Sequence, residues 1–370
     1  MKKITALLLC IVMLISLTGC GENDIPKEIT ILTLSNYLPT DTIKDFTADT
    51  GIAVKQVTAS SYEEIQQMVE QDSSAYDVVI ACDYVMDALV KGKLLQEIDY
   101  KKFPNDKYVT PGYKGKYFDP QSKFTVPYAA IGVLIGYDPA KAGIIINSYA
   151  DLLAPSLKDS VIFIDDYEVV VGIANLLAGK SVDYSENLND TVKICKALSK
   201  SRYPISGDVE YPEDLLVEGQ ASVGLLYTTQ LGYAISANPN LEIVYPKEGF
   251  LASIDSLAIS SGSDAKASAM KFINFIHDPV TNGKAVQEIG YSSANISGKQ
   301  FMDEEYRNDG YNIKNSNADQ CILVPKISND ARIQMQWCYN NRFLNYEEST
   351  DVPQQQAPSE QATSEQAVTQ

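Results

Sequence analysis

The alternation of strand-like and helix-like segments near the start of the chain most constrains how it folds. The third strand-like run, 76–82, is almost continuously apolar, as in a parallel sheet covered on both faces. Residues 29–92 therefore predict a doubly wound α/β sheet. The strand-like runs are 29–34, 52–57 and 76–82. A predicted helix follows each of them, beginning near Thr40, near Ser60 or Ser61, and near Tyr84. The first of these helices stops before Gly51 and the last before Gly92.

Polar side chains follow two of these strands, at the points where the strands end. Ligands bind beyond the carboxyl ends of such strands, so these residues are the first candidates for a site. A tyrosine at such a position is usually packing, but two at equivalent strand ends favour a binding rim. The candidates are Asn36 and Tyr37 after the first strand, and Cys82, Asp83 and Tyr84 after the third.

The middle of the chain continues the alternation. A strand at 161–164 is followed by Asp165 and Asp166, and a strand at 221–227 ends in Tyr227. Helix capping explains one of the two adjacent carboxylates and leaves the other free to face a ligand. Further elements are a strand at 131–137, helices at 148–153, 168–177, 188–198, 228–238, 265–276, 280–289 and 332–344, a strand at 241–244, and an irregular stretch at 300–320.

The stretch 245–259 places a carboxylate inside a strand-like run. It breaks at Pro246 and Gly249, and from Ser253 onward apolar and polar residues alternate around Asp255. Asp255 is either a surface residue on the solvent face of the strand or a carboxylate positioned to receive a cation. An unpaired buried charge is costly, so the second interpretation implies a ligand.

Length and charge set broad limits. A chain of 370 residues predicts about two domains. The 30 basic and 48 acidic residues give a formal net charge of −18, which repels nucleic acid and anionic lipid. The same charge favours cationic partners, although it also serves solubility.

The N-terminus predicts export. Lys2 and Lys3 precede an apolar run, 4–17, and Leu17-Thr18-Gly19-Cys20 resembles a bacterial lipobox. We expect a cleaved signal peptide at 1–19, lipidation of Cys20 and a polar tether at 20–27. The alternative is an uncleaved anchor, for which the apolar run is short. Residues 346–370 lack large apolar side chains apart from Tyr346 and are predicted to be a disordered tail.

Cysteine and histidine usage argues against several chemistries. Outside the leader and lipobox the cysteines form no CxxC pair, and His277 is the only histidine, which gives no support to a zinc site or a histidine-dependent triad. We therefore predict no metal, no cofactor and no catalytic residue. Cys321 and Cys338 are either a disulfide or buried free thiols. His277 is expected at a helix C-terminus, a position that favours a positive charge.

Short motifs in a characteristic order resemble one known family, the spermidine/putrescine-binding proteins of bacterial polyamine ABC importers. The resemblance covers residues 28–345. The motifs are Tyr37-Leu38-Pro39, Thr50-Gly51-Ile52, Ala75-Tyr76-Asp77-Val78-Val79, Val126-Pro127-Tyr128, Asp165-Asp166, Pro246-Lys247-Glu248-Gly249, Asp255-Ser256-Leu257-Ala258-Ile259 and Ile289-Gly290-Tyr291.

This resemblance implies a type II periplasmic-binding-protein-like fold, with two α/β lobes joined by crossing strands and a ligand cleft between them. The first lobe is expected to contain 28–130 and 254–299. The second is expected to contain 131–253 and 300–345. The stretch around Asp255 would then be a crossing strand at the cleft.

The resemblance also implies a set of ligand-binding residues, with several departures from the family pattern. Cys82 stands in place of a family serine, Tyr227 and Ser253 replace tryptophans, and Val169 replaces a glutamate. Losing a carboxylate and two tryptophans changes ligand preference or weakens binding. The expected ligand-binding residues are Tyr37, Cys82, Asp83, Tyr84, Asp166, Tyr227, Asp255 and Tyr291, with Asn36, Glu168, Ser253 and Ser328 as further candidates.

The function that the resemblance implies is capture of a polyamine, putrescine or spermidine, by a monomeric protein held by lipid at the outer face of the cytoplasmic membrane. Its partners would be the permease and ATPase of an ABC importer. Carboxylates neutralise ammonium charges and aromatic faces line methylenes, so Asp166 and Asp255 are hypothesised to hold two ends of a short amine. The alternatives are another small organic cation or solute, or a surface sensor lipoprotein; an enzyme is disfavoured.

Overall fold

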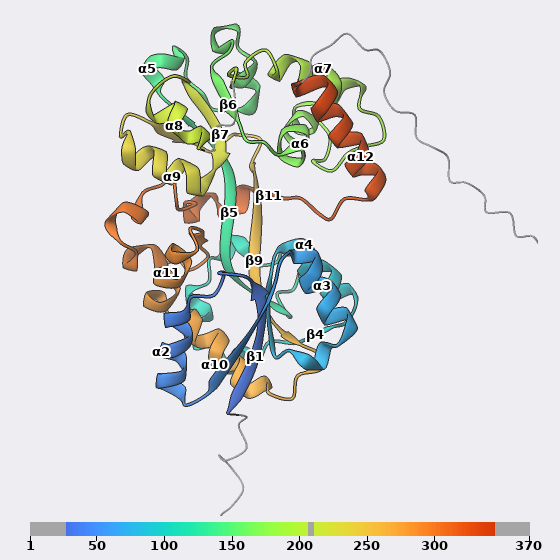
Figure 1. The fold of residues 1–370 in the computed structure, drawn as a ribbon, viewed down its shortest axis with the longest axis vertical. Helices are drawn as coiled ribbons and strands as arrows, with labels where there is room; N and C mark the ends of the chain where they lie inside the picture. The colour runs from blue at the N-terminus through green and yellow to red at the C-terminus, as the bar shows by residue number, and fades with distance from the viewer. Residues whose placement is uncertain (1–26, 206–210, 345–370) are drawn as a thin grey trace, which may run out of the picture. The chain divides into compact units, whose positions relative to one another are not determined.

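The computed structural model describes residues 27–205 and 211–344, which form two compact units (Figure 1). The first unit contains the described chain up to Ile131 together with Ser253–Asp319, and the second contains Gly132–Ala252 and the chain from Gln320 onward. The predicted signal peptide, Cys20, the tether up to residue 26 and the tail 346–370 lie outside the described residues.

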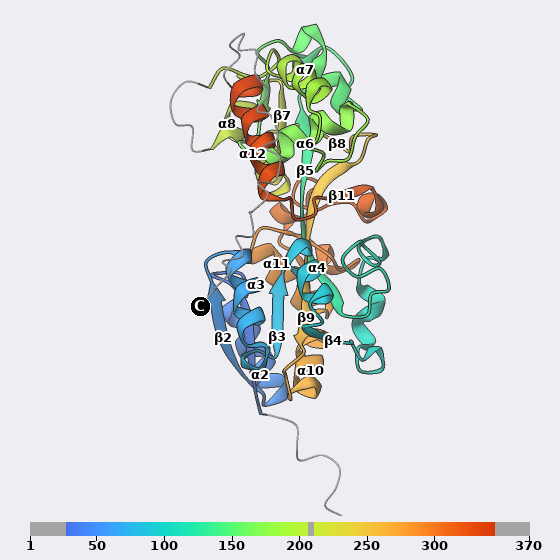
Figure 2. The ribbon, with the colours of Figure 1, turned by 90° about the vertical axis from the view of Figure 1, so that its right-hand side faces the viewer.

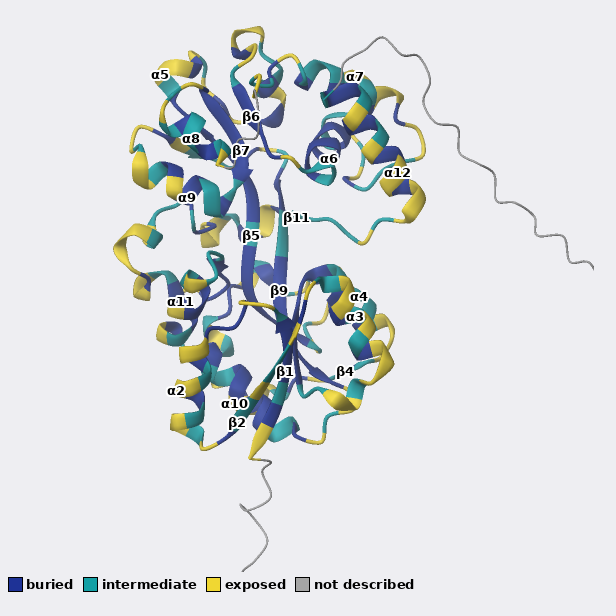
Figure 3. Ribbon diagram, viewed as in Figure 1, coloured by how far each residue is buried: buried dark blue, intermediate teal, exposed yellow. Residues whose placement is uncertain are grey.

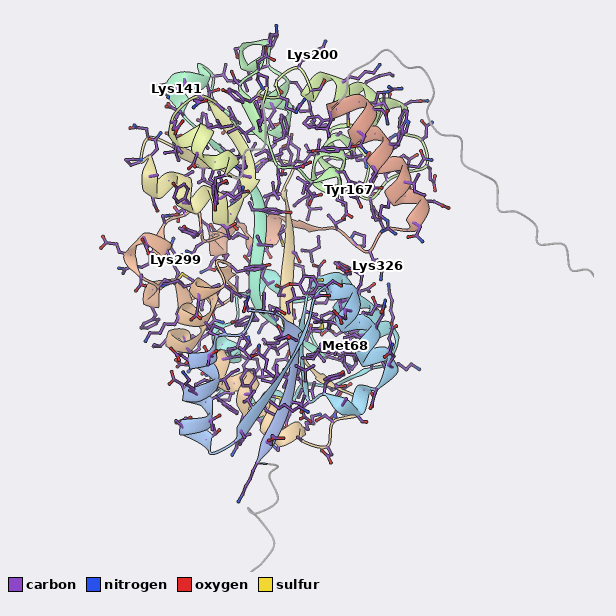
Figure 4. The ribbon with its side chains drawn as sticks, in the orientation of Figure 1. Met68, Lys141, Tyr167, Lys200, Lys299 and Lys326 are labelled. Carbon is purple, nitrogen blue, oxygen red and sulfur yellow. The ribbon has the colours of Figure 1, made fainter. Side chains whose placement is uncertain are left out.

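The boundaries expected after residue 130 and before residue 254 each differ by one residue from the observed ones, but the boundary expected after residue 299 was wrong. The chain was expected to leave the first lobe after residue 299, whereas 300–319 belong to the first unit. Polar contacts hold this segment there: Lys299 Nζ lies 2.8 Å from Asp309 Oδ1, and Thr110 Oγ1 donates to Asn315 Oδ1 over 3.2 Å (Lys299 is labelled in Figure 4). The segment was expected to be irregular because it carries no apolar period, and it forms short 3₁₀ turns.

The first unit begins with the predicted β-α alternation. Strand β1 is parallel to both β2 and β3, and β3 is antiparallel to β9, which gives the order β2-β1-β3-β9 (Figure 2 shows β2 at the edge). The elements are β1 (Glu28–Leu34), α2 (Thr40–Thr50), β2 (Ala53–Ala59), α3 (Tyr62–Gln71), β3 (Val78–Ala81), α4 (Asp83–Lys91), β4 (Leu95–Gln96), α10 (Lys266–Ile276), α11 (Pro279–Glu288) and β10 (Ser292–Ser293).

The helix ends of this unit show which of the predicted boundary residues cap a helix. Ser61 Oγ accepts a hydrogen bond from Glu64 N at 3.1 Å and caps α3, as one of the two expected serines. Gly51 ends α2 in the left-handed conformation with φ 70°, which glycine adopts without strain. The helix expected to begin near Thr40 starts at that residue, and its N-cap is Pro39, which makes no side-chain hydrogen bond.

Two long strands carry residues of both units. Strand β5 (Thr125–Tyr137) starts in the first unit and ends in the second, and β9 (Phe250–Ser260) runs from the second into the first. Both are buried over most of their length (Figure 3). Strand β5 starts six residues before the expected Ile131, because residues from Thr125 onward are also buried and extended.

The second unit is a smaller α/β assembly. Strand β5 is antiparallel to β7 and β8, β6 is parallel to β7, and β11 is parallel to β9. The elements are α5 (Pro139–Ala142), β6 (Val161–Phe163), α6 (Tyr167–Leu177), α7 (Asn189–Leu198), α8 (Pro212–Val217), β7 (Val223–Tyr227), α9 (Thr228–Ala237), β8 (Glu242–Val244), β11 (Cys321–Leu323), α12 (Asn329–Cys338) and a π-helix (Tyr339–Leu344).

Each unit has its own hydrophobic core. In the first, Phe46 of α2 packs edge-on against Phe272 of α10, with ring centroids 5.2 Å apart. In the second, Phe163 of β6 packs against Phe343 of the π-helix at 5.0 Å. Separate cores are what allow two units to fold as independent bodies.

The cysteines and the histidine have structural surroundings. The four described cysteines are buried free thiols, which confirms that alternative for Cys321 and Cys338, and Cys338 Sγ lies 3.5 Å from Cys195 Sγ. His277 caps the C-terminus of α10 as expected. It is buried, and burial lowers its pKa, so the expected stabilisation of a positive charge at the helix end is weakened. Among the described residues, no helix is long and apolar enough to cross a membrane, and no cluster of His, Cys, Asp or Glu could hold a metal ion.

Candidate functional site

Asp255 lies in the middle of β9 and is buried, with only 1% of its surface exposed. The interpretation as a surface residue is therefore wrong. Both Tyr37 and Tyr62 donate their hydroxyl hydrogens to its Oδ2, the latter over 2.9 Å. Its Oδ1 is buried and has no hydrogen-bond partner.

No Lys, Arg or His among the described residues forms an ion pair with this carboxylate. None of the ion pairs formed by the described residues includes Asp255 or Asp83. Burial raises the pKa of Asp255 to about 7, and the two tyrosine hydroxyls oppose that shift without cancelling it. An unpartnered oxygen on a desolvated carboxylate is an arrangement that a cationic ligand stabilises.

Asp83 is a second buried carboxylate in the same unit, with 2% exposure at the first position of α4. Its Oδ1 accepts from Ser253 Oγ at 2.9 Å, and its Oδ2 accepts from Tyr117 OH at 3.2 Å. Burial raises its pKa to about 6, and its charge adds to the raised pKa of Asp255. The ionised forms of the two carboxylates therefore repel each other.

Tyrosine rings surround these carboxylates. Tyr37 packs edge-on against Tyr291, with ring centroids 5.6 Å apart, and against Tyr128 at 6.1 Å. Tyr62 packs edge-on against Tyr84 at 6.2 Å. Burial raises the pKa of each of these phenols, so all of them are neutral at physiological pH and their hydroxyl groups carry hydrogens.

Cys82 and Asn36, two other predicted ligand-binding residues of the first unit, are placed differently relative to the carboxylates. Cys82 is the buried N-cap of α4, and burial together with the charge of Asp255 raises its thiol pKa. Asn36 is exposed in a turn with φ 58°, a left-handed conformation that asparagine tolerates. Cys82 thus borders the carboxylates, whereas Asn36 has a local backbone role.

The second unit has its own group of predicted residues at the ends of β6 and β7. Asp166 caps α6: its Oδ1 accepts from Glu168 N at 2.8 Å and from Val169 N at 3.2 Å. Its Oδ2 accepts from Tyr227 OH at 3.0 Å. Because β6 and β7 are parallel, their carboxyl ends meet at one edge, which brings these side chains together.

The remaining predicted residues of the second unit have helix-end partners. Tyr167 OH donates to Glu168 Oε1 at 2.8 Å (Tyr167 is labelled in Figure 4). Ser328 caps α12 by accepting from Ala331 N at 3.1 Å. Glu168 and Ser328 therefore both make contacts at helix starts. Asp165 accepts from Tyr339 OH at 2.8 Å.

Sequence reasoning missed Tyr62 and Tyr117. Tyr62 follows the end of β2, the one early strand end that we did not consider, so the same rule would have identified it. Tyr117 lies in an irregular segment whose sequence carries no signal for a contact with Asp83. Tyr128 and Tyr339 were also missed.

Comparison of the sequence with known proteins finds one family model and several relatives that agree with one another. A family model described as bacterial extracellular solute-binding protein matches residues 41–310. A spermidine/putrescine-binding periplasmic protein of Salmonella typhimurium is 30% identical over 284 residues, covering 74% of this chain and 80% of the relative. Spermidine/putrescine-binding periplasmic protein 1 of Haemophilus influenzae is 28% identical over 331 residues, covering 84% and 90%.

The fold is shared with a solved structure. The spermidine/putrescine ABC transporter substrate-binding protein PotD of Streptococcus pneumoniae superposes with a TM-score of 0.70 at 22% identity, over 85% of this chain and 98% of that one. The expected two-lobed type II fold is confirmed at this level. The chain belongs to the family of bacterial extracellular solute-binding proteins.

Proposed function

We propose that the protein binds a polyamine, putrescine or spermidine, outside the cytoplasm and delivers it to the permease and ATPase of an ABC importer. The observation that carries the proposal is the buried carboxylate of Asp255, which has an unpartnered oxygen, no ion pair with any described residue, and tyrosine rings around it. Ammonium groups pair with carboxylates, and methylenes pack on aromatic faces. The relatives named above bind spermidine or putrescine according to their names.

The proposed ligand-binding residues fall in two groups. Asp255 and Asp83 supply charge in the first unit, and Asp166 supplies it in the second. The tyrosines supply apolar surface and hydroxyl donors. The full proposed set is Tyr37, Cys82, Asp83, Tyr84, Ser253, Asp255 and Tyr291 with Asp166 and Tyr227, to which the contacts of Asp255 and Asp83 add Tyr62 and Tyr117.

We further propose lipid attachment through Cys20, a monomeric state and no catalytic activity. The lipobox-like Leu17-Thr18-Gly19-Cys20 after an apolar run supports the attachment. Membership of a solute-binding family supports a binding role over catalysis.

Calorimetry with putrescine, cadaverine, spermidine and spermine on the purified chain tests the ligand class. The proposal expects saturable binding of at least one of them and a rise in melting temperature with ligand concentration. Silence toward all four amines, with a response to another organic cation or to an uncharged solute, would reject a polyamine as the ligand.

A further inference from the structure

A polar cavity of about 400 Å³ lies in the first unit and shares no lining residue with the proposed amine site. All of its lining residues come from the segment 293–316, which belongs wholly to the first unit. Its volume is within the range of sites that hold small organic ligands. The charges and hydrogen-bonding groups of its wall indicate which ligand it suits.

The wall of this cavity carries a net positive charge. Lys299 Nζ lies 2.8 Å from Asp309 Oδ1, and Lys314 Nζ lies 3.2 Å from Asp309 Oδ2. Burial alone would raise the pKa of Asp309, but the two lysines lower it below its usual value, so this carboxyl group is ionised at neutral pH. Two lysines thus flank one carboxylate, in a chain whose overall charge is −18. This local excess of positive charge favours an anion.

Asn312, another lining residue, has an amide oxygen without a hydrogen-bond donor. Its Nδ2 donates to Tyr306 O at 2.6 Å, and because a carbonyl oxygen only accepts, this contact determines which way the amide is oriented. The side chain is 3% exposed, and its Oδ1 has no partner in the part of the chain that the structure describes. A buried acceptor without a donor is costly, and a donor group on a ligand in the cavity would recover that cost.

Other polar side chains of the wall already have partners within the protein. Ser293 Oγ donates to Asn282 Oδ1 at 2.5 Å, and Asn295 Nδ2 donates to His277 O at 2.9 Å. Asn315 both accepts and donates a hydrogen bond. The groups that remain to recognise a ligand are therefore the two ammonium groups and the unpartnered amide oxygen.

We propose that this cavity binds a small hydroxy acid, whose carboxylate pairs with Lys299 and Lys314 and whose hydroxyl donates to Asn312 Oδ1. A carboxylate forms charge-assisted hydrogen bonds with ammonium groups, and its charge balances that of the wall. A neutral hydroxyl supplies the missing donor without adding a positive charge beside two lysines, as an amino group would. The site goes beyond the proposed amine binding and does not depend on it, because its residues differ and its ligand has the opposite charge.

Saturation-transfer NMR titrations of the purified full-length chain with L-lactate, propanoate and L-alanine test the proposal. The three probes share a carboxylate on a three-carbon frame, to which lactate adds a hydroxyl and alanine an ammonium group. L-Lactate is expected to bind about fivefold more tightly than propanoate, because it makes one more hydrogen bond, and more tightly than L-alanine.

Substitution of a lysine tests the carboxylate contact. Lys314→Gln should weaken L-lactate binding about fivefold or more, because it removes a charge-assisted hydrogen bond. The matched control is Lys123→Gln, which removes a similarly exposed, ion-paired lysine of the same unit and should leave L-lactate binding unchanged. Equal losses in these two variants would overturn the site.

The remaining outcomes separate this site from the proposed function. Equal affinities for L-lactate and propanoate, or tighter binding of L-alanine, would overturn the hydroxy-acid site. A protein that binds polyamines but not L-lactate loses only this site, whereas one that binds L-lactate but no polyamine loses only the proposed function. If Lys314→Gln does not fold, as judged by its thermal unfolding, the wild-type comparison of L-lactate with propanoate decides.

Discussion

At the scale of single residues, the environment of Asp255 determines what this carboxylate can do. It lies among tyrosines and near another carboxylate, and no positively charged side chain that the structure describes forms an ion pair with it. The protein therefore holds an anion in an unfavourable state, which a cation relieves. Two predictions follow from this one group.

Replacing Asp255 with Asn removes the charge and keeps an oxygen that accepts from Tyr37 and Tyr62. We expect polyamine affinity to fall about 100-fold, because breaking a buried ion pair at one partner leaves the other uncompensated. Apo stability should not decrease. Calorimetry measures the affinity, and Asp45→Asn is the control; a variant that binds as tightly as wild type would exclude Asp255 from the site.

The raised pKa of Asp255 predicts opposite pH dependences of stability and binding. Its pKa is about 7 in the folded protein and near its usual value when unfolded, so the folded state binds this proton more tightly. Its contribution to apo stability is fully present below about pH 4 and is lost as the pH rises to about 7. Ligand affinity should instead rise through pH 7, because the ammonium group binds the ionised form.

Melting temperatures of wild type and Asp255→Asn between pH 4 and pH 8 check the first part. The wild type should lose stability relative to the variant as the pH rises, and a constant difference would contradict the assignment. The groups that face Asp255 are the phenols of Tyr37, Tyr62, Tyr128 and Tyr291, the thiol of Cys82 and the carboxyl group of Asp83, which itself titrates near pH 6.

At the scale of helices and strands, several functional candidates are also helix ends. Asp166 caps α6 and Asp83 begins α4, so each carboxylate meets the positive end of a helix. A helix start that follows a parallel strand thus both ends the strand and positions a side chain. Experiments must therefore separate the structural role of such a side chain from its role in ligand binding.

Asp166 allows that separation, because Asn also caps helices but carries no charge. Asp166→Ala should lower the free energy of unfolding by about 1 kcal/mol, whereas Asp166→Asn should change it little. Both variants should weaken polyamine binding if the carboxylate contacts the ligand. Urea unfolding and calorimetry measure the two effects; unchanged binding by Asp166→Asn would leave Asp166 with the capping role alone.

The contact between α7 and the end of α12 predicts a preferred thiol pairing. The sulfurs of Cys195 and Cys338 lie 3.5 Å apart in the core, and a disulfide needs about 2 Å. Oxidation of the native protein by diamide should join these two cysteines and stabilise the protein by about 2–4 kcal/mol. Peptide mapping after alkylation checks the link, which Cys195→Ser should abolish; a Cys321–Cys338 link would contradict it.

At the scale of the whole molecule, the chain combines a lipobox-like segment, two folded units and a net charge of −18. The charge raises the local concentration of cations near the protein, and the effect falls with ionic strength. The buried carboxylates are screened much less, so salt is expected to affect the association rate more than the dissociation rate.

The lipobox-like segment predicts how the protein is held. Cys20→Ala should release it from the membrane, because the proposed lipid chains are then not attached. Fractionation of cells producing the wild-type and variant chains measures this, and mass spectrometry of the mature N-terminus identifies the modified residue. Polyamine binding should be unchanged in the variant, and a variant that stays with the membrane fraction would contradict attachment through Cys20.

The sequence alone determined the local features of this protein. Alternating apolar runs, Ser61 and Gly51 predicted the strands and helices of the first unit, because these signals act through neighbours in the chain. The rule that ligands bind beyond strand ends also identified Tyr37, Asp83 and Asp166. The resemblance to the polyamine-binding family ended the first lobe at residue 299, whereas the chain remains in the first unit up to Asp319; the polar contacts that hold this segment leave no periodic pattern in the sequence.

Only the tertiary structure decided which of these side chains act together. Tyr37 and Tyr62 reach Asp255 across 218 and 193 residues of sequence, and Asp83 meets Ser253 across 170. Burial of Asp255, its unpartnered oxygen and the neighbouring second carboxylate all depend on how β3, β9 and α3 pack. Local sequence patterns do not encode such convergence, because it arises from the packing of elements that are distant in the chain.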